Sequence, residues 1–435
     1  MKRQLKAALF GSVALAAMAA TTPAMAQETS SSIRGTVVSQ AGSELAGVTV
    51  EITHVPSGTT RTFTTNSDGV FYARGLRVGG PYIVKLADGT EYQANSIEDV
   101  FLSLGRPTPV TLVAAAAGSS IEEITVTASA VAGVPVALGP SSTYDLSDLE
   151  NAPAINRDIK DVIRQDPRVY IDETFEDSVQ CAGANPRFNS LTVDGVGLND
   201  NFGLNSNGFP TTRIPFSFDA IQQVAVELAP FDVEYGAFTA CNINAVTKSG
   251  TNEFHGGAFF DYSSDGLQGK NLEGEDPFDI GDFSEKRYGA TLGGPIIKDK
   301  LFFFAAYEKL EGSKLFDRGP AGSGAARIVQ GVSQEQLDRI VDIAKNIYGY
   351  DPGTLPGSLP VSDEKILAKI DWNINDNHRL ALTYNYNDGF TIAESDGDDD
   401  ELELSNHYYE RGTKLESYAG SLFSDWTDRL STELR

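Results

Sequence analysis

Alternating apolar and polar positions dominate the second half of the chain, from residue 255 onward. In the run Leu380–Asn387, leucine and tyrosine occupy the even positions, while alanine, threonine and asparagine occupy the odd ones. Successive side chains of a strand point to opposite faces, so this pattern predicts a strand with one apolar and one polar face. The run 365–372 follows the same rule, with Ile366, Ala368, Ile370 and Trp372 opposite Lys365, Lys369 and Asp371.

The connections between these predicted strands alternate between short and long. Tight turns are predicted at 298–300, 375–377 and 427–429, and long polar connections at 267–284, 311–362 and 391–404. Outer-membrane barrels have short turns on the periplasmic side and long loops outside. The pattern therefore predicts roughly seven antiparallel transmembrane strands, with Leu380, Leu382, Tyr384 and Ile370 facing lipid.

Plugged barrels close at about 22 strands. The sequence ends at Arg435, inside a further predicted strand, so we expect a truncated chain whose barrel is an open, incomplete sheet. One helix is predicted in the longest loop, at Ser333–Tyr348. Ser333 and Gln336 form a capping box, and apolar residues follow at helical spacing.

The N-terminus has the pattern of an export signal. Lys2, Arg3 and Lys6 precede the apolar stretch Ala7–Ala20, and Ala24-Met25-Ala26 supplies small residues for cleavage. We expect residues 1–26 to be removed. A buried N-terminal helix is the alternative.

Between Ile33 and Val113, short β-branched runs alternate with turn residues, which predicts a small all-β unit. The clearest turns are 66–69 and 87–90, because Asp-Gly adopts the positive φ of tight turns. The runs at 35–37, 45–50 and 64–71 resemble the carboxypeptidase regulatory-like domain. That resemblance implies a β-sandwich without catalytic activity.

Residues 145–255 are predicted to be short helices and strands joined by loops rich in Asn, Asp and Gly. Helices are expected at Leu146–Ala154 and Arg157–Gln165, the second stopped by Asp166-Pro167. The stretches 191–196, 221–227 and 245–252 resemble the plug of TonB-dependent receptors. Gly236 and Asn242–Thr251 are similar to its Oar-like subgroup.

The segment Ile124, Thr125, Val126, Thr127, Ala128 follows the small, polar linker residues 114–120. One interpretation is a further strand of the sandwich. The other is a TonB contact, because an isolated extended segment can add to the sheet edge of a partner. Its position next to the plug favours the TonB contact.

Cys181 and Cys241 are the two cysteines of the chain. In an exported protein an even count permits one disulfide, here across the plug. Closing a loop of that size stabilises a fold by about 4 kcal/mol. Two unpaired thiols remain the alternative, because the sequence gives no distance between them.

Composition excludes several classes of function. The formal net charge of -26 repels nucleic acid, so no nucleic-acid partner is expected. Serine-hydrolase elbows, phosphate-binding loops and C-x-x-C motifs are absent. His407 and Glu410 match a zinc-binding H-x-x-E pair, but they are expected on opposite faces of a strand. We therefore predict no enzyme, no metal and no cofactor.

Two further groups of residues are candidates for binding a ligand. The acidic run 394–401 suits a calcium ion or, as the preferred interpretation, a solvated surface loop. Arg187 and Arg213 are placed near plug loops, where they either touch a ligand or bond internally. No ligand-binding residue is assigned from the sequence.

The predicted fold class is dominated by β-structure: an N-terminal β-sandwich, a mixed α/β plug, and the first strands of an incomplete antiparallel transmembrane barrel. The predicted parts are 1–26, 27–113, 114–144 (linker with the TonB contact), 145–255 and 256–435. The resemblance implies active uptake of an extracellular ligand, an oligosaccharide, peptide or siderophore, across the outer membrane of a Gram-negative bacterium. It implies outer-membrane lipid and the TonB–ExbB–ExbD complex as partners. An Oar-like surface protein for adhesion or export support, and a soluble periplasmic binding module, are the alternatives.

Overall fold

The computed structural model describes residues 28–435 except 89–90, 95, 117–138, 155, 174–176, 204, 231–234, 237, 270–280, 317, 324, 326, 396–399 and 428–429. The predicted signal peptide and the predicted TonB contact, Ile124–Ala128, lie outside the described residues.

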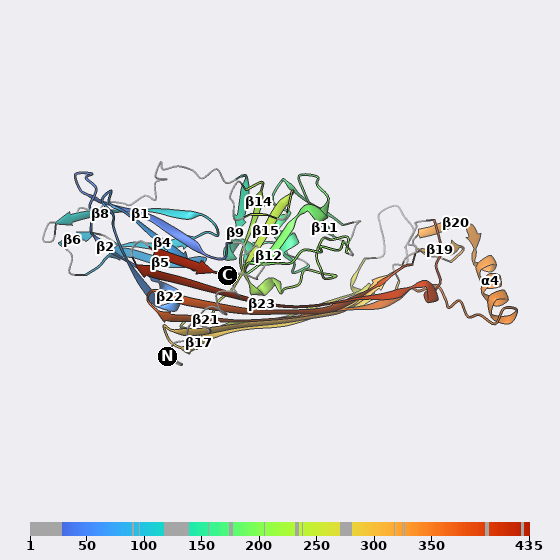
Figure 1. Ribbon diagram of the computed structural model, residues 1–435. Coiled ribbons are helices and arrows are strands. Elements are labelled where there is room, and N and C mark those ends of the chain that lie inside the picture. The colour runs from blue at the N-terminus through green and yellow to red at the C-terminus, as the bar shows by residue number, and fades with distance from the viewer. Residues whose placement is uncertain are drawn as a thin grey trace, which may run out of the picture.

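A β-sandwich of two four-stranded sheets forms the N-terminal part of the described chain (Figure 1). One sheet has the order β4-β1-β8-β6 and the other β3-β2-β5-β7. The strands are β1 (Ser31–Ser39), β2 (Thr49–His54), β3 (Thr59–Thr64), β4 (Val70–Leu76), β5 (Gly79–Leu86), β6 (Tyr92–Ala94), β7 (Ile97–Leu102) and β8 (Pro107–Ala116), with the 3-10 turn η1 (Val55–Ser57) after β2. β1 pairs antiparallel with β4 and parallel with β8.

Period-two alternation builds this sandwich. In β2, Val50 and Ile52 are buried in the core, while Glu51 and Thr53 are half-buried on the outside. The core between the sheets includes Ile33, Val37, Val50, Ile52, Phe71, Val84 and Leu112. The predicted turn at 66–69 is present: the Gly69 amide donates to the Asn66 carbonyl at 3.1 Å, and Gly69 has a φ of 66°.

Residues 139–254, which we call the plug, are built around a five-stranded sheet of order β13-β12-β15-β14-β9. Its strands are β9 (Ser141–Tyr144), β12 (Ser190–Val193), β13 (Val196–Gly197), β14 (Ile221–Leu228) and β15 (Cys241–Thr247). The plug also contains a hairpin of β10 (Val169–Asp172) and β11 (Ser178–Cys181). Its helices are α2 (Leu146–Asn151) and α3 (Ile159–Ile163), and its 3-10 turns are η2 (Pro186–Phe188) and η3 (Phe218–Ala220). One apolar core joins the helices to the sheet through Leu149, Val162, Ile163, Leu191, Phe216, Val224 and Ile243.

The two plug helices are shorter than the sequence predicts. α2 ends at Asn151 because Ala152 precedes Pro153 and adopts an extended conformation, which the proline ring favours. α3 begins only at Ile159, because the side chain of Asp158 caps the helix by accepting from the Lys160 amide at 2.9 Å.

Seven antiparallel strands form the third part, a single curved sheet that we call the wall. In sheet order they are β16 (His255–Ser264), β17 (Ser284–Ile297), β18 (Leu301–Leu315), β21 (Ser358–Asn375), β22 (His378–Ala393), β23 (Tyr409–Thr427) and β24 (Leu430–Leu434). The 3-10 turns η4 (Asp265–Leu267) and η5 (Ser405–His407) lie in its long connections. The predicted number of strands and the open, antiparallel sheet are confirmed.

The predicted faces of the wall are also confirmed. In β22, Thr383, Asn385 and Asn387 are buried, whereas the side chain of Leu382 is 47% exposed. In β21, Lys365, Lys369 and Asp371 are buried, and Ile366, Ile370 and Trp372 are exposed. The polar face of β21 and β22 is therefore the inner one, whereas β18 buries Phe302, Phe304, Ala306 and Leu310 together with Glu308.

Two long connections are shorter than predicted. Residues 311–315 continue β18 and pair with 358–362 of β21, and β22 continues to Ala393. Regular backbone pairing extends the strands through polar residues that the sequence pattern assigns to loops. The remaining connection between β18 and β21 holds β19 (Arg318–Ala321), β20 (Arg327–Ser333) and α4 (Gln334–Asn346). α4 has the predicted Ser333–Gln336 capping box.

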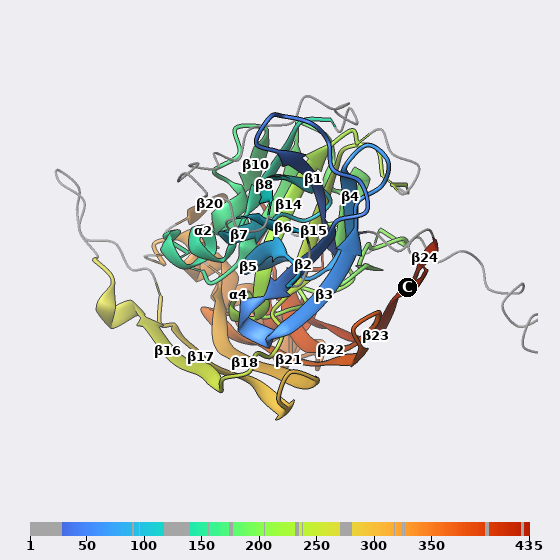
Figure 2. The same cartoon turned by 90° about the vertical axis from the view of Figure 1, so that its left-hand side faces the viewer.

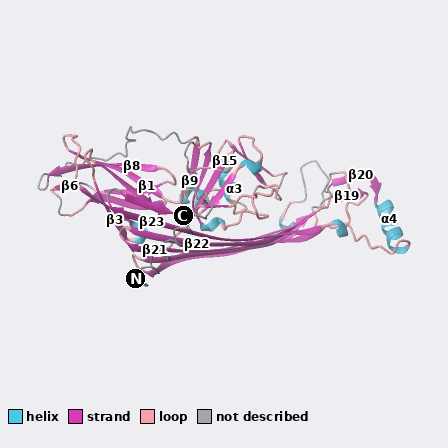
Figure 3. Cartoon of the chain, in the orientation of Figure 1, coloured by secondary structure: helices cyan, strands magenta, loops and turns pink. Residues whose placement is uncertain are grey.

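The wall strands run beneath the sandwich at one end and beneath the plug in the middle (Figures 1 and 3). β19, β20 and α4 lie beyond the opposite end of the strands. Viewed along the strands, the wall curves around the other two parts (Figure 2).

Candidate functional site

The Asp194-Gly195 turn between β12 and β13 brings a carboxylate to the inner face of the wall. Asp194 and Gly195 have φ values of 46° and 83°, as this tight turn requires. The Asp194 carboxylate is buried and accepts from the Thr247 amide at 3.0 Å and from the Thr247 hydroxyl at 2.6 Å. It also accepts from the hydroxyl of Thr383, on wall strand β22, at 2.9 Å.

Lys369 of the wall completes this contact. Its Nζ lies 3.4 Å from Asp194 Oδ2 and donates to the Thr247 carbonyl at 3.1 Å. A buried charge is tolerated when it has an opposite charge and hydrogen-bond partners, and Lys369 has both. We call Asp194, Thr247, Lys369 and Thr383 the plug anchor.

Two arginines join the plug and the wall nearer the long loops. Arg157 of the plug donates to Asp219 Oδ1 at 2.6 Å, and its guanidinium lies 3.8 Å from the ring centre of Phe259 in β16. Arg287 of β17 donates to the carbonyl of Asn156 and pairs with Glu285 at 3.2 Å.

A cleft of about 410 Å³ opens between the plug and those wall ends that lead into the long connections. The plug lines it with Asn156, Asp158, Lys160, Asp161, Arg164, Ile171, Asp177, Thr212 and Arg213, and the wall with Glu285, Arg287, Ser313, Lys314, Val361, Phe390, Thr391 and Arg411. This volume is within the range of roughly 300–1,000 Å³ typical of small-molecule sites. We call it the ligand cleft.

The lining of the ligand cleft is strongly charged, with six basic and four acidic side chains. Several opposite charges are neighbours: Lys160 lies 3.5 Å from Asp158, and Arg164 lies 3.7 Å from Asp161. Such a lining suits a polar ligand that forms several hydrogen bonds.

The two arginines singled out in the sequence are separated. Arg213 lines the ligand cleft. Arg187 donates to the Gly203 carbonyl at 3.0 Å and so bonds within a plug loop. Sequence reasoning missed Arg287 and Arg411 as cleft residues. Each is a charged residue at a position where the alternation of its strand places the side chain on the inner face. The sequence pattern could therefore have identified both.

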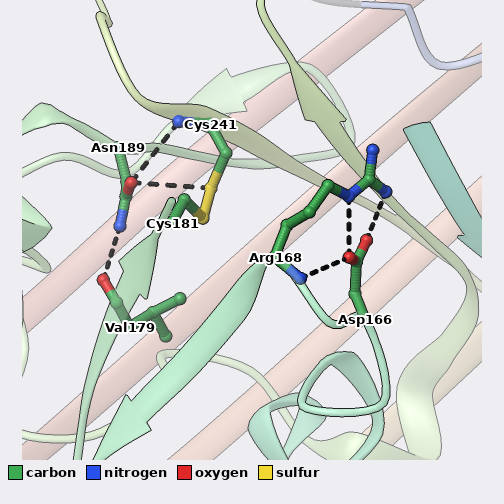
Figure 4. Close-up of a disulfide and its surroundings, with 6 residues drawn as sticks. All are labelled: Asp166, Arg168, Val179, Cys181, Asn189 and Cys241. Atoms are coloured by element: carbon green, nitrogen blue, oxygen red, sulfur yellow. Dashed lines mark hydrogen bonds and ion pairs between the residues drawn. A yellow bond between two sulfur atoms is a disulfide. The ribbon is translucent and has the colours of Figure 1, made fainter. Parts of the chain in front are cut away.

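The structure joins Cys181 of β11 and Cys241 of β15 in a disulfide, with a Cα–Cα distance of 5.8 Å (Figure 4). Asn189 connects the same region, since its Oδ1 accepts from the Cys241 amide at 3.5 Å and its Nδ2 donates to the Val179 carbonyl at 2.7 Å. The disulfide therefore ties the β10–β11 hairpin to the central sheet.

The Arg168 guanidinium is paired with Asp166 in the same part of the plug, with Nε donating to Oδ1 at 2.7 Å (Figure 4). This hydrogen bond lowers the pKa of Asp166 to about 2. The Asp166 carboxylate is therefore ionised at neutral pH.

The zinc-like pair His407 and Glu410 is arranged differently from the prediction. His407 ends the 3-10 turn η5 and is not on a strand, because β23 begins only at Tyr409. Among the described residues no three His, Cys, Asp or Glu side chains are grouped in a way that would hold a metal ion. Within the acidic run, Glu394 lies 3.4 Å from Arg318 and so belongs to the loop's own bonding.

A second cavity, of about 400 Å³, lies under the plug at the opposite end from the ligand cleft. The sandwich, the plug and the wall each contribute to it, through residues such as Arg77, Lys248 and Phe254. Burial lowers the pKa of Lys248.

Over the described part of the chain, no helix has the length and apolar character of a membrane-spanning helix.

Two family descriptions match this chain. The carboxypeptidase regulatory-like domain matches residues 32–115, and the outer membrane beta barrel domain matches residues 246–315. The chain is thus an outer-membrane protein in which a regulatory-like domain precedes the first strands of a barrel.

The chain is a homologue of the TonB-dependent transporter Oar of Myxococcus xanthus, to which it is 37% identical over 140 residues. The match covers 30% of this chain and 12% of that relative's length. The outer membrane transporter YddB from Escherichia coli aligns with a TM-score of 0.46 and 14% identity, over 66% of this chain and 37% of its own. The siderophore receptor PirA from Acinetobacter baumannii aligns with a TM-score of 0.43 and 21% identity, over 66% and 38%.

Proposed function

We propose that this chain is part of a TonB-dependent receptor that takes up an extracellular ligand across the outer membrane. The ligand cleft carries this proposal. It lies between the plug and the loop-bearing ends of the wall strands, where a ligand arriving from outside meets both parts.

The proposed cycle begins when the ligand binds between Arg213 of the plug and Arg287 and Arg411 of the wall. TonB, energised by ExbB and ExbD, then pulls on Ile124–Ala128, and the plug separates from the wall at the plug anchor. The proton gradient supplies the driving force, so the cycle needs no cofactor and no catalytic step. We assign the chain no enzymatic activity.

The proposed parts are a signal peptide at 1–26, a regulatory-like sandwich at 27–113, a linker with the TonB contact at 114–144, a plug at 145–255 and barrel strands at 256–435. Oligosaccharides, peptides and ferric siderophores are the ligand classes that fit a polar, charged cleft. Outer-membrane lipid surrounds the apolar outer face of the wall.

The test is depletion of a defined mixture of oligosaccharides, short peptides and ferric siderophores by cells that carry the full-length receptor. We expect one class to disappear from the medium, and a protonophore to stop its disappearance. Arg213→Ala should reduce the rate, because Arg213 lines the cleft, whereas Arg187→Ala should not, because Arg187 bonds within a plug loop.

Equal depletion by cells with and without the receptor would contradict the proposal. If the receptor instead promoted attachment of cells to one another or to a surface, the function would be that of an Oar-like adhesion protein.

A further inference from the structure

The sandwich contacts the turn-bearing ends of the wall strands through a row of polar bonds. The Asn373 side chain donates to the Thr59 hydroxyl at 2.7 Å, and the Asn252 amide donates to the Pro56 carbonyl at 2.8 Å. Arg61 of β3 forms an ion pair with Asp425 of β23. These bonds reach two wall strands, β21 and β23, and the last residues of the plug, so the contact is broad.

A buried charged group lies at the centre of this contact. Asp371 of the wall accepts from Arg379 at 3.2 Å, and its Oδ1 lies 3.7 Å from Arg77 of the sandwich. Arg77 also donates to Asn373 Oδ1 at 3.0 Å. The side chains of Arg77 and Asp371 are 8% and 1% exposed, so the sandwich supplies a buried charge to the inner face of the wall.

The sandwich also packs against the plug. Val78 and Leu104 of the sandwich form a buried apolar cluster with Ala225 and Val246 of the plug. Beside this cluster the Leu104 amide donates to the Gln223 side chain at 2.6 Å. Apolar burial and a satisfied backbone donor together indicate a packed interface.

The second cavity lies at this junction. The sandwich lines it with His54, Arg77 and Val78, opposite plug residues that include Lys248 and Ser249. The sandwich thus covers the underside of the plug on the side of the wall that carries the short turns.

We propose that the regulatory-like sandwich is a periplasmic cap, docked on the plug and the wall, which shields the space beneath the plug and must separate from both before a path opens. Its role in traffic rests on the proposed function, whereas the docking and the shielding do not. The sandwich docks on the underside of the plug and on the inner rim of the wall. Two contacts hold it there: the Asp371 carboxylate between the guanidinium groups of Arg77 and Arg379, and the apolar cluster of Val78, Leu104, Ala225 and Val246.

Docking is tested by a cysteine pair in the full-length receptor in outer-membrane fragments. Thr59→Cys with Asn373→Cys should form a disulfide on mild oxidation, because the two side chains are in contact. The control pair is Thr62→Cys with Asn373→Cys, since Thr62 lies on the same strand, three residues on, and is exposed. Absence of the first disulfide, or equal yields from both pairs, would overturn the proposal.

Shielding is tested by the rate at which Ser249→Cys reacts with a polyethylene-glycol maleimide in the same fragments. Arg61→Asp should raise that rate several-fold, because it replaces an attraction to Asp425 by repulsion. The charge swap Arg61→Asp with Asp425→Arg should return the rate towards its starting value. Lys85→Asp is the matched control, because Lys85 pairs with Glu51 within the sandwich.

Equal labelling rates in all four proteins would show that the sandwich does not cover the cavity. A rate raised as much by Lys85→Asp as by Arg61→Asp would show loosening of the sandwich itself. Neither measurement uses a ligand or TonB, so these outcomes are independent of whether the proposed uptake is correct.

Discussion

Buried charges on the inner face of the wall determine how the plug is held. The alternation along β21 predicts that Lys365, Lys369 and Asp371 point inward, and they do. Their partners were not predictable, because they come from three places in the chain: Glu308 of the wall for Lys365, Asp194 of the plug for Lys369, and Arg77 of the sandwich for Asp371. Period-two patterning fixes the face of a side chain and carries no information about distant partners.

The plug anchor yields a prediction about stability. Lys369→Met leaves the Asp194 carboxylate without its cation, and breaking a buried pair costs about 3–5 kcal/mol. We expect Lys369→Met to make the plug of the full-length receptor markedly more sensitive to pulse proteolysis in denaturant. Lys365→Met is the control, because the Lys365 ammonium pairs with Glu308 and Asp363 inside the wall. Equal sensitivity of the plug to proteolysis in Lys369→Met and Lys365→Met would show that the plug anchor does not hold the plug.

The cysteine pair yields a second prediction at this scale. In protein taken from the cell envelope, a digest without reducing agent should contain one peptide pair joined through Cys181 and Cys241. The residues face each other across β11 and β15 at a Cα–Cα distance that a disulfide can span. Two thiols that react with an alkylating agent before reduction would refute it.

At the scale of elements, local rules predicted most of what the structure contains. The capping box placed α4, and alternation placed the wall strands. The sequence pattern did not predict the end of α2 or the start of α3. Ala152-Pro153 fixes the first and the Asp158 cap fixes the second, and each depends on only one or two residues. The parallel pairing of β1 with β8 joins segments more than 70 residues apart and has no local signal.

Long strands have a structural consequence for the outer end of the wall. β21 spans 18 residues, whereas a tilted strand crosses the hydrocarbon layer in about 9–11 residues. β21 is therefore longer than the hydrocarbon layer requires, and part of it extends beyond that layer. β19, β20 and α4 are held further out still (Figure 1).

The sandwich should lose stability in mild acid because of His54. Burial, with the nearby charges of Arg77 and Arg379, lowers the pKa of His54 to about 3, and Asp371 opposes this only in part. The unfolded chain binds this proton near pH 6.5, so the unfolded state takes up more protons between pH 6.5 and 3, and stability falls as the pH falls through that range. At pH 5 the loss is about 2 kcal/mol.

Hydrogen exchange of the β2 and β5 amides in the full-length receptor, corrected for intrinsic rates, measures this loss. His54→Gln should flatten the dependence between pH 7 and 5, because glutamine does not titrate. The same slope in wild type and His54→Gln would show that other groups cause it.

At the scale of the whole molecule, the sequence predicted three parts in the right order but not their mutual packing. The contact of Val78 and Leu104 with Ala225 and Val246 depends on apolar residues that look like ordinary strand and turn positions. The ligand cleft was not predictable either, because its lining comes from several segments of the plug and from five wall strands. Only the folded arrangement brings these residues together.

Backbone bonding makes a prediction for the parts in isolation. The wall has two open edges, β16 and β24, and each unsatisfied backbone group in hydrocarbon costs several kcal/mol. Residues 27–435 expressed alone should therefore aggregate or be degraded. Residues 27–255 should be soluble, because the sandwich and the plug each have an internal core. Recovery of 27–435 as a membrane-inserted, heat-resistant monomer would contradict this.

Binding of the TonB periplasmic domain to the purified full-length receptor tests the proposed function most directly. Strand addition needs backbone donors, and proline removes one, so Val126→Pro should weaken binding at least about tenfold. Val131→Pro is the matched control, since it lies outside Ile124–Ala128 in the same connecting segment, and it should bind as the wild type does. If TonB bound neither the wild type nor the control, or bound Val126→Pro unchanged, the assignment of this chain to a TonB-driven receptor with its contact at Ile124–Ala128 would be wrong.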